Sequence, residues 1–276
     1  MQEHTIDGVR VRTDDLDLPG LKWLKPDMIA RCKEMNAGEP EGRRVMAARR
    51  ADEALSCAGI PLRYADTEMH SLQRVGGNDN AFQVAQTFIE NALERLRAGR
   101  GIVFNGAVGC GKTALAIAIV KEIARTWTTA PTYEYVIIPD GLIQFKIHHF
   151  RKSGSINTLS ILPMYISTRA FLESLKPTGD RTNERVKPWA VRASDQDGLT
   201  ITILDDLGSE YQTEWAHDQI DSFINHCYEN RISLIVTTNQ NKDELSKRIG
   251  ARATDRLWEM CTWRSFTCES WRGKTA

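Results

Sequence analysis

Hydrophobic positions form an alternation of helical and extended segments from about residue 80 onward. Apolar side chains recur every three or four residues over 82–96 and again over 215–228, which predicts two helices with one buried face each. The Ala-rich run at 114–124 is apolar almost throughout, as is typical of a helix buried on several sides. Asn80 is placed to cap the first of these helices, and Gly99 to end it.

Short apolar segments rich in β-branched residues alternate with these helices. The segments at 101–104, 201–204 and 234–237 predict buried strands. Strands that alternate with helices indicate an α/β fold, in which a parallel, doubly wound sheet carries helices on both faces.

Two similar apolar segments compete for the second strand of this sheet, residues 135–138 and residues 164–167. We favour 164–167, because residues 170–175 continue it as a helix. That choice makes residues 129–160 an insertion into the α/β domain.

The chain before this alternation has a different character. Residues 1–35 are polar and weakly periodic, whereas residues 42–57 predict a charged helix that stops before a Gly- and Pro-containing segment. A pair of glycines near residue 77 marks a boundary. We therefore expect a small, mostly helical N-terminal region over residues 1–76 and an α/β domain over residues 77–276.

Composition narrows the class of protein. The 276 residues are 41% hydrophobic and 26% charged, an ordinary globular mixture, and their formal net charge is +0, so any contact with nucleic acid must come from local patches. The six cysteines show no C-x-x-C spacing, which indicates reduced thiols. We expect a cytoplasmic protein that does not enter a membrane, because the sequence shows neither a signal-peptide core nor an apolar run that could span a bilayer.

The octapeptide at residues 106–113 carries the most specific chemical signal. It matches the phosphate-binding loop pattern G-x-x-x-x-G-K-[ST], with a predicted strand before it and a helix after it. Its glycines let backbone N–H groups surround a phosphate, Lys112 would reach the β- and γ-phosphates, and Thr113 would offer its hydroxyl to Mg²⁺. The residues that we expect to bind ATP are Gly106, Ala107, Val108, Gly109, Cys110, Gly111, Lys112 and Thr113.

Two acids follow the strand at 201–204. Hydrolysis of a bound nucleotide requires a carboxylate for the metal ion and a group that orients the attacking water. We expect Asp205 to hold Mg²⁺, directly or through water, and Asp206 to polarise the water. The alternative is a surface strand that ends in acidic residues.

Three further polar residues complete the candidate set. Asn239 ends the strand at 234–237, where an amide would contact the γ-phosphate or the water; a simple turn residue is the alternative. Arg252 and Arg256 lie four residues apart and share one face of a predicted helix. An arginine that reaches a neighbouring subunit's γ-phosphate raises turnover by several orders of magnitude, and Arg252 is our first candidate for this role and Arg256 the second. The alternative is a pair of solvated or salt-bridged arginines.

Taken together, these motifs resemble those of the DnaC/DnaI-type helicase loaders, which are AAA+ ATPases of the initiator type, and those of the similar IstB transposition helpers. The resemblance covers about residues 45–272 and is more specific than the phosphate loop alone. Besides that loop it rests on Ala-Gly-Ile-Pro-Leu-Arg-Tyr at 58–64, Asp-Asp-Leu-Gly at 205–208, Thr-Glu-Trp-Ala at 213–216, the strand that ends at Asn239, and the arginine helix at 248–257.

The resemblance implies a P-loop AAA+ fold of the initiator type, with ATP and Mg²⁺ as cofactors. One departure from the family is that the sequence ends soon after Arg272, so we expect no C-terminal helical lid. The resemblance makes Asn239 the first sensor residue, Arg252 the arginine finger, and Arg272 the C-terminal arginine that senses the nucleotide. Asp206 stands where many AAA+ proteins have glutamate; its shorter side chain predicts slow hydrolysis, which suits a switch.

The resemblance also implies a set of partners. These are a hexameric DnaB-type replicative helicase bound through the N-terminal part, single-stranded DNA, and further copies of the chain in an open ring or spiral. Such a protein would deliver the helicase during initiation of DNA replication. Two alternatives remain: an IstB-like transposition helper that forms filaments on duplex DNA, and a small-molecule kinase built on the phosphate loop.

Some weaker signals stay open at this stage. The basic stretches at 146–152 and 176–192 could contact DNA phosphates, or they could be a solvated hairpin and a linker. With only Cys32 and Cys57 in the first hundred residues, we expect no zinc module, and we take His4 and His70 as surface residues.

Overall fold

The structure is a computed structural model. Contacts between residues divide the chain into two compact units, Met1–Asp52 with Thr128–Ser160 and Glu53–Trp127 with Ile161–Ala276. We expected residues 1–76 to bind a partner; a division into compact units does not test that expectation. The residues that the structure describes are 2–6, 9–13, 40–128, 133–137, 143–147, 160–176, 198–209 and 213–270.

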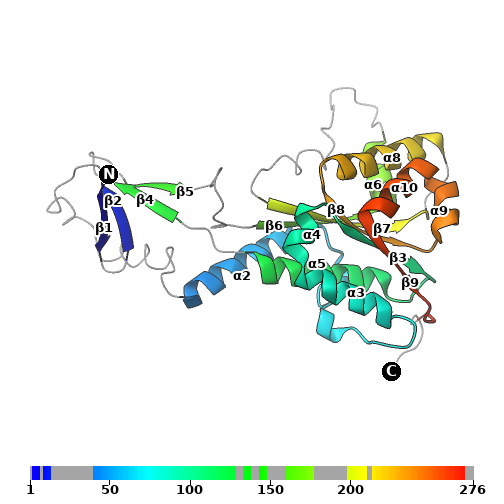
Figure 1. Cartoon of the computed structure of the whole chain (residues 1–276), viewed down its shortest axis with the longest axis horizontal. Coiled ribbons are helices and arrows are strands. Elements are labelled where there is room, and N and C mark those ends of the chain that lie inside the picture. The colour runs from blue at the N-terminus through cyan, green and yellow to red at the C-terminus, as the bar shows by residue number, and fades with distance from the viewer. Residues whose placement is uncertain are drawn as a thin grey trace. The chain divides into compact units, whose positions relative to one another are not determined.

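The first unit contains a four-stranded sheet in the order β1-β2-β4-β5 (Figure 1). Strands β1 (Gln2–Ile6) and β2 (Val9–Thr13) form an antiparallel pair, and β2 pairs in parallel with β4 (Tyr133–Ile137), which is antiparallel to β5 (Ile143–Ile147). The segment that we expected to be an insertion therefore supplies two of the four strands. Weak periodicity over residues 1–35 did not reveal β1 and β2.

The second unit is built on a five-stranded sheet in the order β6-β7-β8-β3-β9. Strand β3 pairs in parallel with both β8 and β9, and β7 pairs in parallel with β8. The strands are β3 (Gly101–Gly106), β6 (Ser160–Ser167), β7 (Gly198–Leu207), β8 (Ser233–Thr238) and β9 (Cys261–Phe266). The parallel α/β sheet that the sequence predicts is confirmed, and 164–167 belongs to this sheet as we expected.

Helices cover both faces of this sheet (Figure 1): α3, α4 and α5 lie on one side, and α6, α8, α9 and α10 on the other. Two 3₁₀ turns, η2 and η3, precede α3. The bounds are α2 (Pro40–Ser56), η2 (Leu62–Tyr64), η3 (Met69–Ser71), α3 (Asp79–Glu90), α4 (Ala92–Arg97), α5 (Lys112–Trp127), α6 (Thr168–Leu175), α8 (Glu214–Glu229), α9 (Lys242–Ile249) and α10 (Ala251–Met260).

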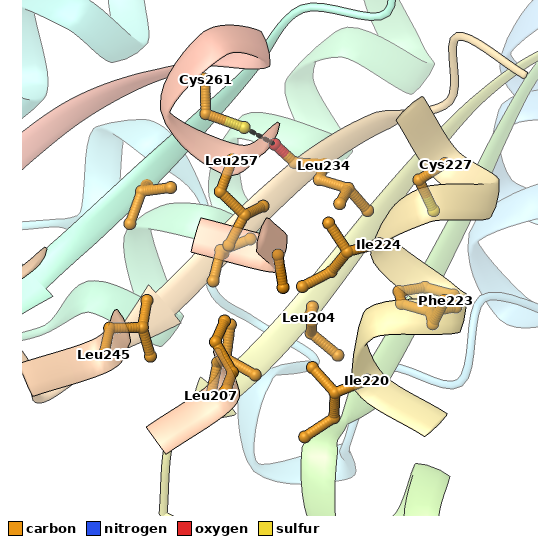
Figure 2. Packing of buried hydrophobic residues seen from close by; sticks show 14 of the residues in the cluster. Leu204, Leu207, Ile220, Phe223, Ile224, Cys227, Leu234, Leu245, Leu257 and Cys261 are labelled. Atoms are coloured by element: carbon orange, nitrogen blue, oxygen red, sulfur yellow. Dashed lines mark hydrogen bonds between the residues drawn. The ribbon is translucent and has the colours of Figure 1, made fainter. Parts of the chain in front are cut away.

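The core between the sheet and the second helical layer comes from the apolar stripe of α8. Ile220, Phe223 and Ile224 pack with Leu204 and Leu234 of the sheet (Figure 2), and all five side chains are buried. Burying a side chain of this size contributes about 1.5–3 kcal/mol, so this layer fixes the sheet on which the candidate site stands.

Two local expectations differ from the structure. The apolar run over 82–96 forms two helices, because the chain turns at Asn91 between α3 and α4. The N-cap of α3 is Asn78 and not Asn80; the Asn78 side chain accepts a hydrogen bond from the backbone N–H of Val75, which ties down the preceding turn. Within the described ranges, no helix is both long enough and apolar enough to cross a bilayer.

Candidate functional site

Three neighbouring strands bring the predicted chemical groups to one edge of the sheet. The phosphate loop follows β3, Asp205 and Asp206 end β7, and Asn239 follows β8, which lies between β7 and β3. Because these strands run in parallel, their carboxyl ends meet at the same edge, where α/β sheets bind ligands. The topology thus gathers residues that are far apart in the sequence.

The phosphate loop depends on glycine at its entrance. Gly106 has φ 146°, and a Cβ there would lie 2.4 Å from the backbone oxygen of Phe266 on β9, so no other residue fits without moving that strand. The loop ends where α5 begins, at Lys112. Its backbone N–H groups and the positive end of the helix dipole favour an anion at this point.

Lys112 lies across the loop and is 7% exposed. Its ammonium donates hydrogen bonds to the carbonyls of Gly106 at 2.9 Å and Ala107 at 2.7 Å, and to Oδ1 of Asn239 at 3.0 Å. A single side chain therefore links the loop after β3 to the end of β8.

Asp205 is the most heavily hydrogen-bonded carboxylate of the site. Its Oδ1 accepts from the hydroxyls of Thr113 and Thr237, each at 2.7 Å, and its Oδ2 accepts from the hydroxyl of Tyr165 at 2.7 Å. Burial, and then the hydrogen bond and negative charge of Asp205, raise the pKa of Tyr165 far above its ordinary value. Tyr165 is therefore a fixed hydroxyl donor that holds the carboxylate in place.

These groups fit a magnesium ion. A hydroxyl and a carboxylate oxygen lie side by side at Thr113 and Asp205, and Mg²⁺ prefers such hard oxygen ligands. No cluster of three or more His, Cys, Asp and Glu residues that could hold a metal occurs in the part of the chain that the structure describes. Mg²⁺ commonly takes one or two protein ligands and completes its shell with phosphate oxygens and water, so Thr113 and Asp205 together would be enough to hold it.

Asp206 occupies an unusual backbone conformation. Its φ is 58°, and the pairing of β7 with β8 shifts register between Leu204 and Leu207. Left-handed backbone at a residue other than glycine costs of order 1–3 kcal/mol and must be held by its surroundings. Here the Asp206 N–H donates to Thr237 Oγ1 at 2.9 Å, and Asn239 Nδ2 donates to Asp206 Oδ1 at 3.0 Å.

Most of these groups line one pocket of about 610 Å³, a volume within the usual range for small-molecule sites; of the predicted phosphate-loop residues, Gly106, Ala107 and Cys110 are not part of its lining. One part of its wall is the phosphate loop with Lys112, Asp205, Asp206 and Asn239. Another part comes from Pro61, Arg63 and Tyr64, which precede the phosphate loop in the chain. The pocket is formed entirely within the second compact unit.

The two candidate arginines of α10 are in different surroundings. Arg256 pairs with Asp221 of α8 at 3.1 Å and is largely buried, as the salt-bridged alternative describes, whereas Arg252 is exposed. Neither residue lines the pocket. Arg272 and most of the basic stretch at 176–192 lie outside the described residues, and so does most of the stretch at 146–152.

Sequence reasoning missed several contributors to the site. Thr237 precedes Asn239 by two residues on β8, so its place at the strand end was a usable signal. Tyr165 was visible only as part of an apolar strand, since nothing in the sequence indicates that β6 lies beside β7. The role of the 58–64 segment as part of the pocket wall was likewise hidden.

Comparison by sequence finds neither a family model nor a curated protein that matches this chain. Comparison of structures finds clear matches in fold. A crystal structure of the DnaC helicase loader is 20% identical with a TM-score of 0.54, over 75% of this chain and 100% of that chain. A crystal structure of DnaI is 16% identical with a TM-score of 0.52, over 76% and 95%.

The replication initiator DnaA, bound to AMPPCP and single-stranded DNA, is 15% identical with a TM-score of 0.51; the match covers 74% of this chain and 51% of that chain. At such identities the likeness establishes the fold. This chain has an α/β fold similar to the folds of these three structures, so the resemblance to the DnaC and DnaI loaders noted in its motifs extends to its three-dimensional structure.

Proposed function

We propose that this protein of initiator-type AAA+ fold is an ATP-dependent loader of a DnaB-type hexameric replicative helicase, acting in initiation of DNA replication. The observation that carries the ATP-binding part is the joined set at the sheet edge. Lys112 bonds to Asn239, Asn239 bonds to Asp206, and Thr113 bonds to Asp205. A phosphate loop alone would bind a nucleotide, whereas this set also supplies a metal position and groups that orient water.

The chemistry of the site follows from its own residues. The loop N–H groups and Lys112 would bind the phosphates, and Thr113 with Asp205 would hold Mg²⁺, which neutralises charge on the β- and γ-phosphates. Asp206 would accept a proton from the attacking water or orient it, and Asn239 holds that carboxylate in place. The short Asp206 side chain supports slow hydrolysis, as in a timing switch.

The partners belong to the same proposal. The resemblance in fold to a DnaC helicase loader and to DnaI supports a helicase partner, and the DnaA match bound to AMPPCP and single-stranded DNA supports nucleotide and DNA binding. Exposure of Arg252 supports its use as a finger in a neighbouring copy of the chain, which requires assembly into an open ring or spiral. The N-terminal region, residues 1–76, is proposed to bind the helicase.

The first test mixes the purified protein with a hexameric replicative helicase and ATP, and measures the mass of the species by light scattering after size exclusion. We expect a stoichiometric complex, together with slow ATP turnover that single-stranded DNA stimulates. Absence of a complex, with filaments on duplex DNA instead, would reject the loader and favour the IstB-like transposition helper. An Asp206→Asn variant should bind ATP and the helicase but lose turnover, which separates binding from hydrolysis.

A further inference from the structure

Three different elements hold the Asp205 side chain, and one of them, β6, carries none of the predicted site residues. Thr113 of α5 and Thr237 of β8 donate their hydroxyls to Oδ1, each at 2.7 Å. Tyr165 of β6 donates its hydroxyl to Oδ2, also at 2.7 Å. A carboxylate oxygen has about two acceptor sites. Among the contacts of the described residues, Oδ1 is therefore fully used, and Oδ2 keeps one acceptor site beside the Tyr165 hydroxyl.

The orientation of this carboxylate decides what it can bind. Asp205, Tyr165 and Thr113 all line the candidate pocket, yet Asp205 is only 9% exposed. Because so little of its surface is accessible, its hydrogen-bond partners determine which acceptor site it presents to a ligand in the pocket.

The segment that carries Tyr165 is fixed around this contact. The Tyr165 N–H donates to the backbone oxygen of Ala58 at 2.7 Å. Three residues later, at the start of α6, the Thr168 hydroxyl donates to the backbone oxygen of Asp205 at 3.0 Å. One segment, β6 with the first residue of α6, therefore contacts both the side chain and the backbone of Asp205.

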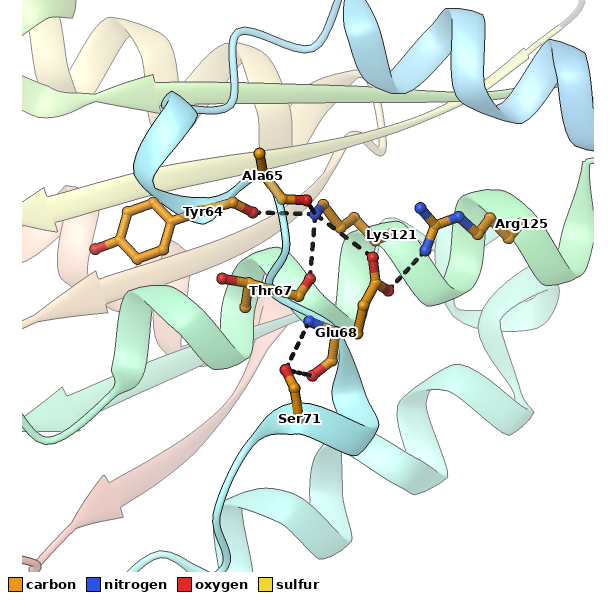
Figure 3. A network of polar contacts seen from close by, with 7 residues as sticks. All are labelled: Tyr64, Ala65, Thr67, Glu68, Ser71, Lys121 and Arg125. Carbon is orange, nitrogen blue, oxygen red and sulfur yellow. Dashed lines mark hydrogen bonds and ion pairs between the residues drawn. The ribbon is translucent and has the colours of Figure 1, made fainter. Parts of the chain in front are cut away.

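The segment that follows Ala58 is anchored in turn to the helix after the phosphate loop. Lys121 of α5 is 5% exposed. Its ammonium donates hydrogen bonds to the backbone oxygens of Tyr64 at 3.0 Å and Thr67 at 3.1 Å (Figure 3). Tyr165 is thus attached to backbone that is itself held by buried polar contacts, which are costly to break.

We propose that Tyr165 is a positioning residue for the divalent cation: its hydroxyl orients Asp205 so that the remaining acceptor site of Oδ2 is presented to Mg²⁺ or to a water bound to it. The inference rests on the proposed binding of ATP with Mg²⁺, and it adds a residue that sets the affinity for the cation. Partners that orient a metal ligand are commonly worth roughly 10–100-fold in metal affinity.

The test measures the Kd of the non-hydrolysable analogue AMPPCP for the full chain by isothermal titration calorimetry, once with excess Mg²⁺ and once with EDTA. The ratio of the Kd in EDTA to the Kd in Mg²⁺ reports the contribution of the cation. For Tyr165→Phe, which removes only the hydroxyl, we expect this ratio to fall roughly tenfold. The Kd in EDTA should stay unchanged, which also shows that the pocket of the variant is folded.

Tyr228→Phe is the matched control. Tyr228 also donates its hydroxyl to a carboxylate, that of Glu259 at 2.9 Å, but it does not line the pocket. The same atom is removed there, so both Kd values should equal those of wild type.

A double variant tests whether Tyr165 acts through Asp205. Asp205→Asn alone should lower the ratio, because it removes the negative charge that faces the cation. Adding Tyr165→Phe to Asp205→Asn should lower it no further, since the carboxylate that the hydroxyl orients is already gone. Additive effects of the two substitutions overturn the inference.

Two other results for Tyr165→Phe overturn the inference and leave the proposed function standing: an unchanged ratio, or equal weakening of AMPPCP in Mg²⁺ and in EDTA. The wild-type protein supplies the remaining distinction. If it binds AMPPCP equally well in both solutions, the role of Tyr165 toward a cation is rejected while nucleotide binding stands. If it binds AMPPCP in neither solution, the proposed function fails and the inference fails with it.

Discussion

At the scale of single residues, the site is organised by short polar contacts that lock one group to the next. Thr237 shows this most clearly, because its hydroxyl donates to the Asp205 carboxylate and accepts from the Asp206 N–H. One side chain on β8 therefore fixes two consecutive acids on β7. Such preorganisation matters for catalysis, since groups already in position need no reorganisation during the reaction.

Lys112→Ala should abolish ATP binding. The substitution removes the cation that would face the β- and γ-phosphates and also breaks the contact with Asn239. Binding of a fluorescent ATP analogue, followed by anisotropy, measures the loss, with Lys247→Ala on the exposed side of α9 as the matched control. Retained affinity in Lys112→Ala would remove the basis for the phosphate-loop assignment.

Arg252→Ala should leave ATP binding by the single subunit unchanged and reduce DNA-stimulated turnover by about 10³-fold, the lower range for an arginine finger. Arg252 is exposed, so its removal disturbs no internal contact that the structure records. Steady-state ATPase assays with single-stranded DNA measure the effect.

Arg256→Ala is the informative comparison for that assay. It breaks the pair with Asp221 and is therefore expected to lower stability as well. If Arg252→Ala turns over normally and Arg256→Ala does not at equal folded fraction, the finger is Arg256; if both turn over normally, no finger of this kind exists.

At the scale of elements, the 3₁₀ turns η2 and η3 depend on α5 in addition to their own few hydrogen bonds. Each has only three residues, too few to be stable alone. Lys121 and Arg125 of α5 supply the contacts that keep this stretch in place. Helix α5, which follows the phosphate loop, thus also holds residues 64–68 through its side chains.

Stability should depend on pH through Glu68. Burial alone would raise its pKa, but the hydrogen bond from Arg125 and the charges of Arg125 and Lys121 outweigh it and lower the pKa below 4.5. A lowered pKa in the folded state means that the carboxylate stabilises the fold above its ordinary pKa, and that this contribution is lost as the pH falls toward the lowered value. Glu68→Gln should therefore be less stable than wild type at pH 7 and lose less stability on acidification.

Urea unfolding at pH 7, 5 and 4 measures this difference. Glu94→Gln, an exposed position on α4, is the control and should follow the wild type. If the free energy of unfolding falls with pH by the same amount in Glu68→Gln and in wild type, the acid sensitivity comes from other carboxylates.

At the scale of the whole molecule, the pocket belongs to one compact unit. That unit begins at Glu53, and its wall residues 61–64 precede the core that the sequence placed after residue 77. We therefore expect the first 76 residues to divide in role: the part before α2 would bind the partner, whereas the part around η2 contributes to the wall of the candidate nucleotide pocket.

Two truncations test this division. A chain that starts at Pro40, where α2 begins, should bind ATP within roughly twofold of wild type, because every residue that lines the pocket is kept. It should lose the helicase complex. A chain that starts at Leu72 lacks the wall and should lose ATP affinity as well. Calorimetry measures ATP affinity, and size exclusion with light scattering measures the helicase complex. If the chain that starts at Pro40 still forms the complex, the helicase interface lies after residue 39.

The sequence by itself determined the class of fold and the residue types that form most of the candidate site. The apolar stripe with a spacing of three or four residues predicted α8, and short continuous apolar segments predicted β3, β7 and β8, all within a few residues. The phosphate loop was equally visible, because its chemistry requires consecutive residues. Strand β9 was missed, since its short, partly exposed segment carries no clear alternation.

Only the tertiary structure decided which residues meet. Strand order places β8 between β7 and β3, and that order alone brings Asn239 to Lys112 and Thr237 to Asp205. Lys121 reads in the sequence as one charge within an apolar helix, and its buried contacts with the Tyr64–Thr67 backbone exist only once the chain has folded back on α5. Local sequence patterns predict which side chains are buried and which backbone conformation a segment adopts. Contacts between segments far apart in the sequence depend on how the helices and strands pack, which a short segment does not reveal.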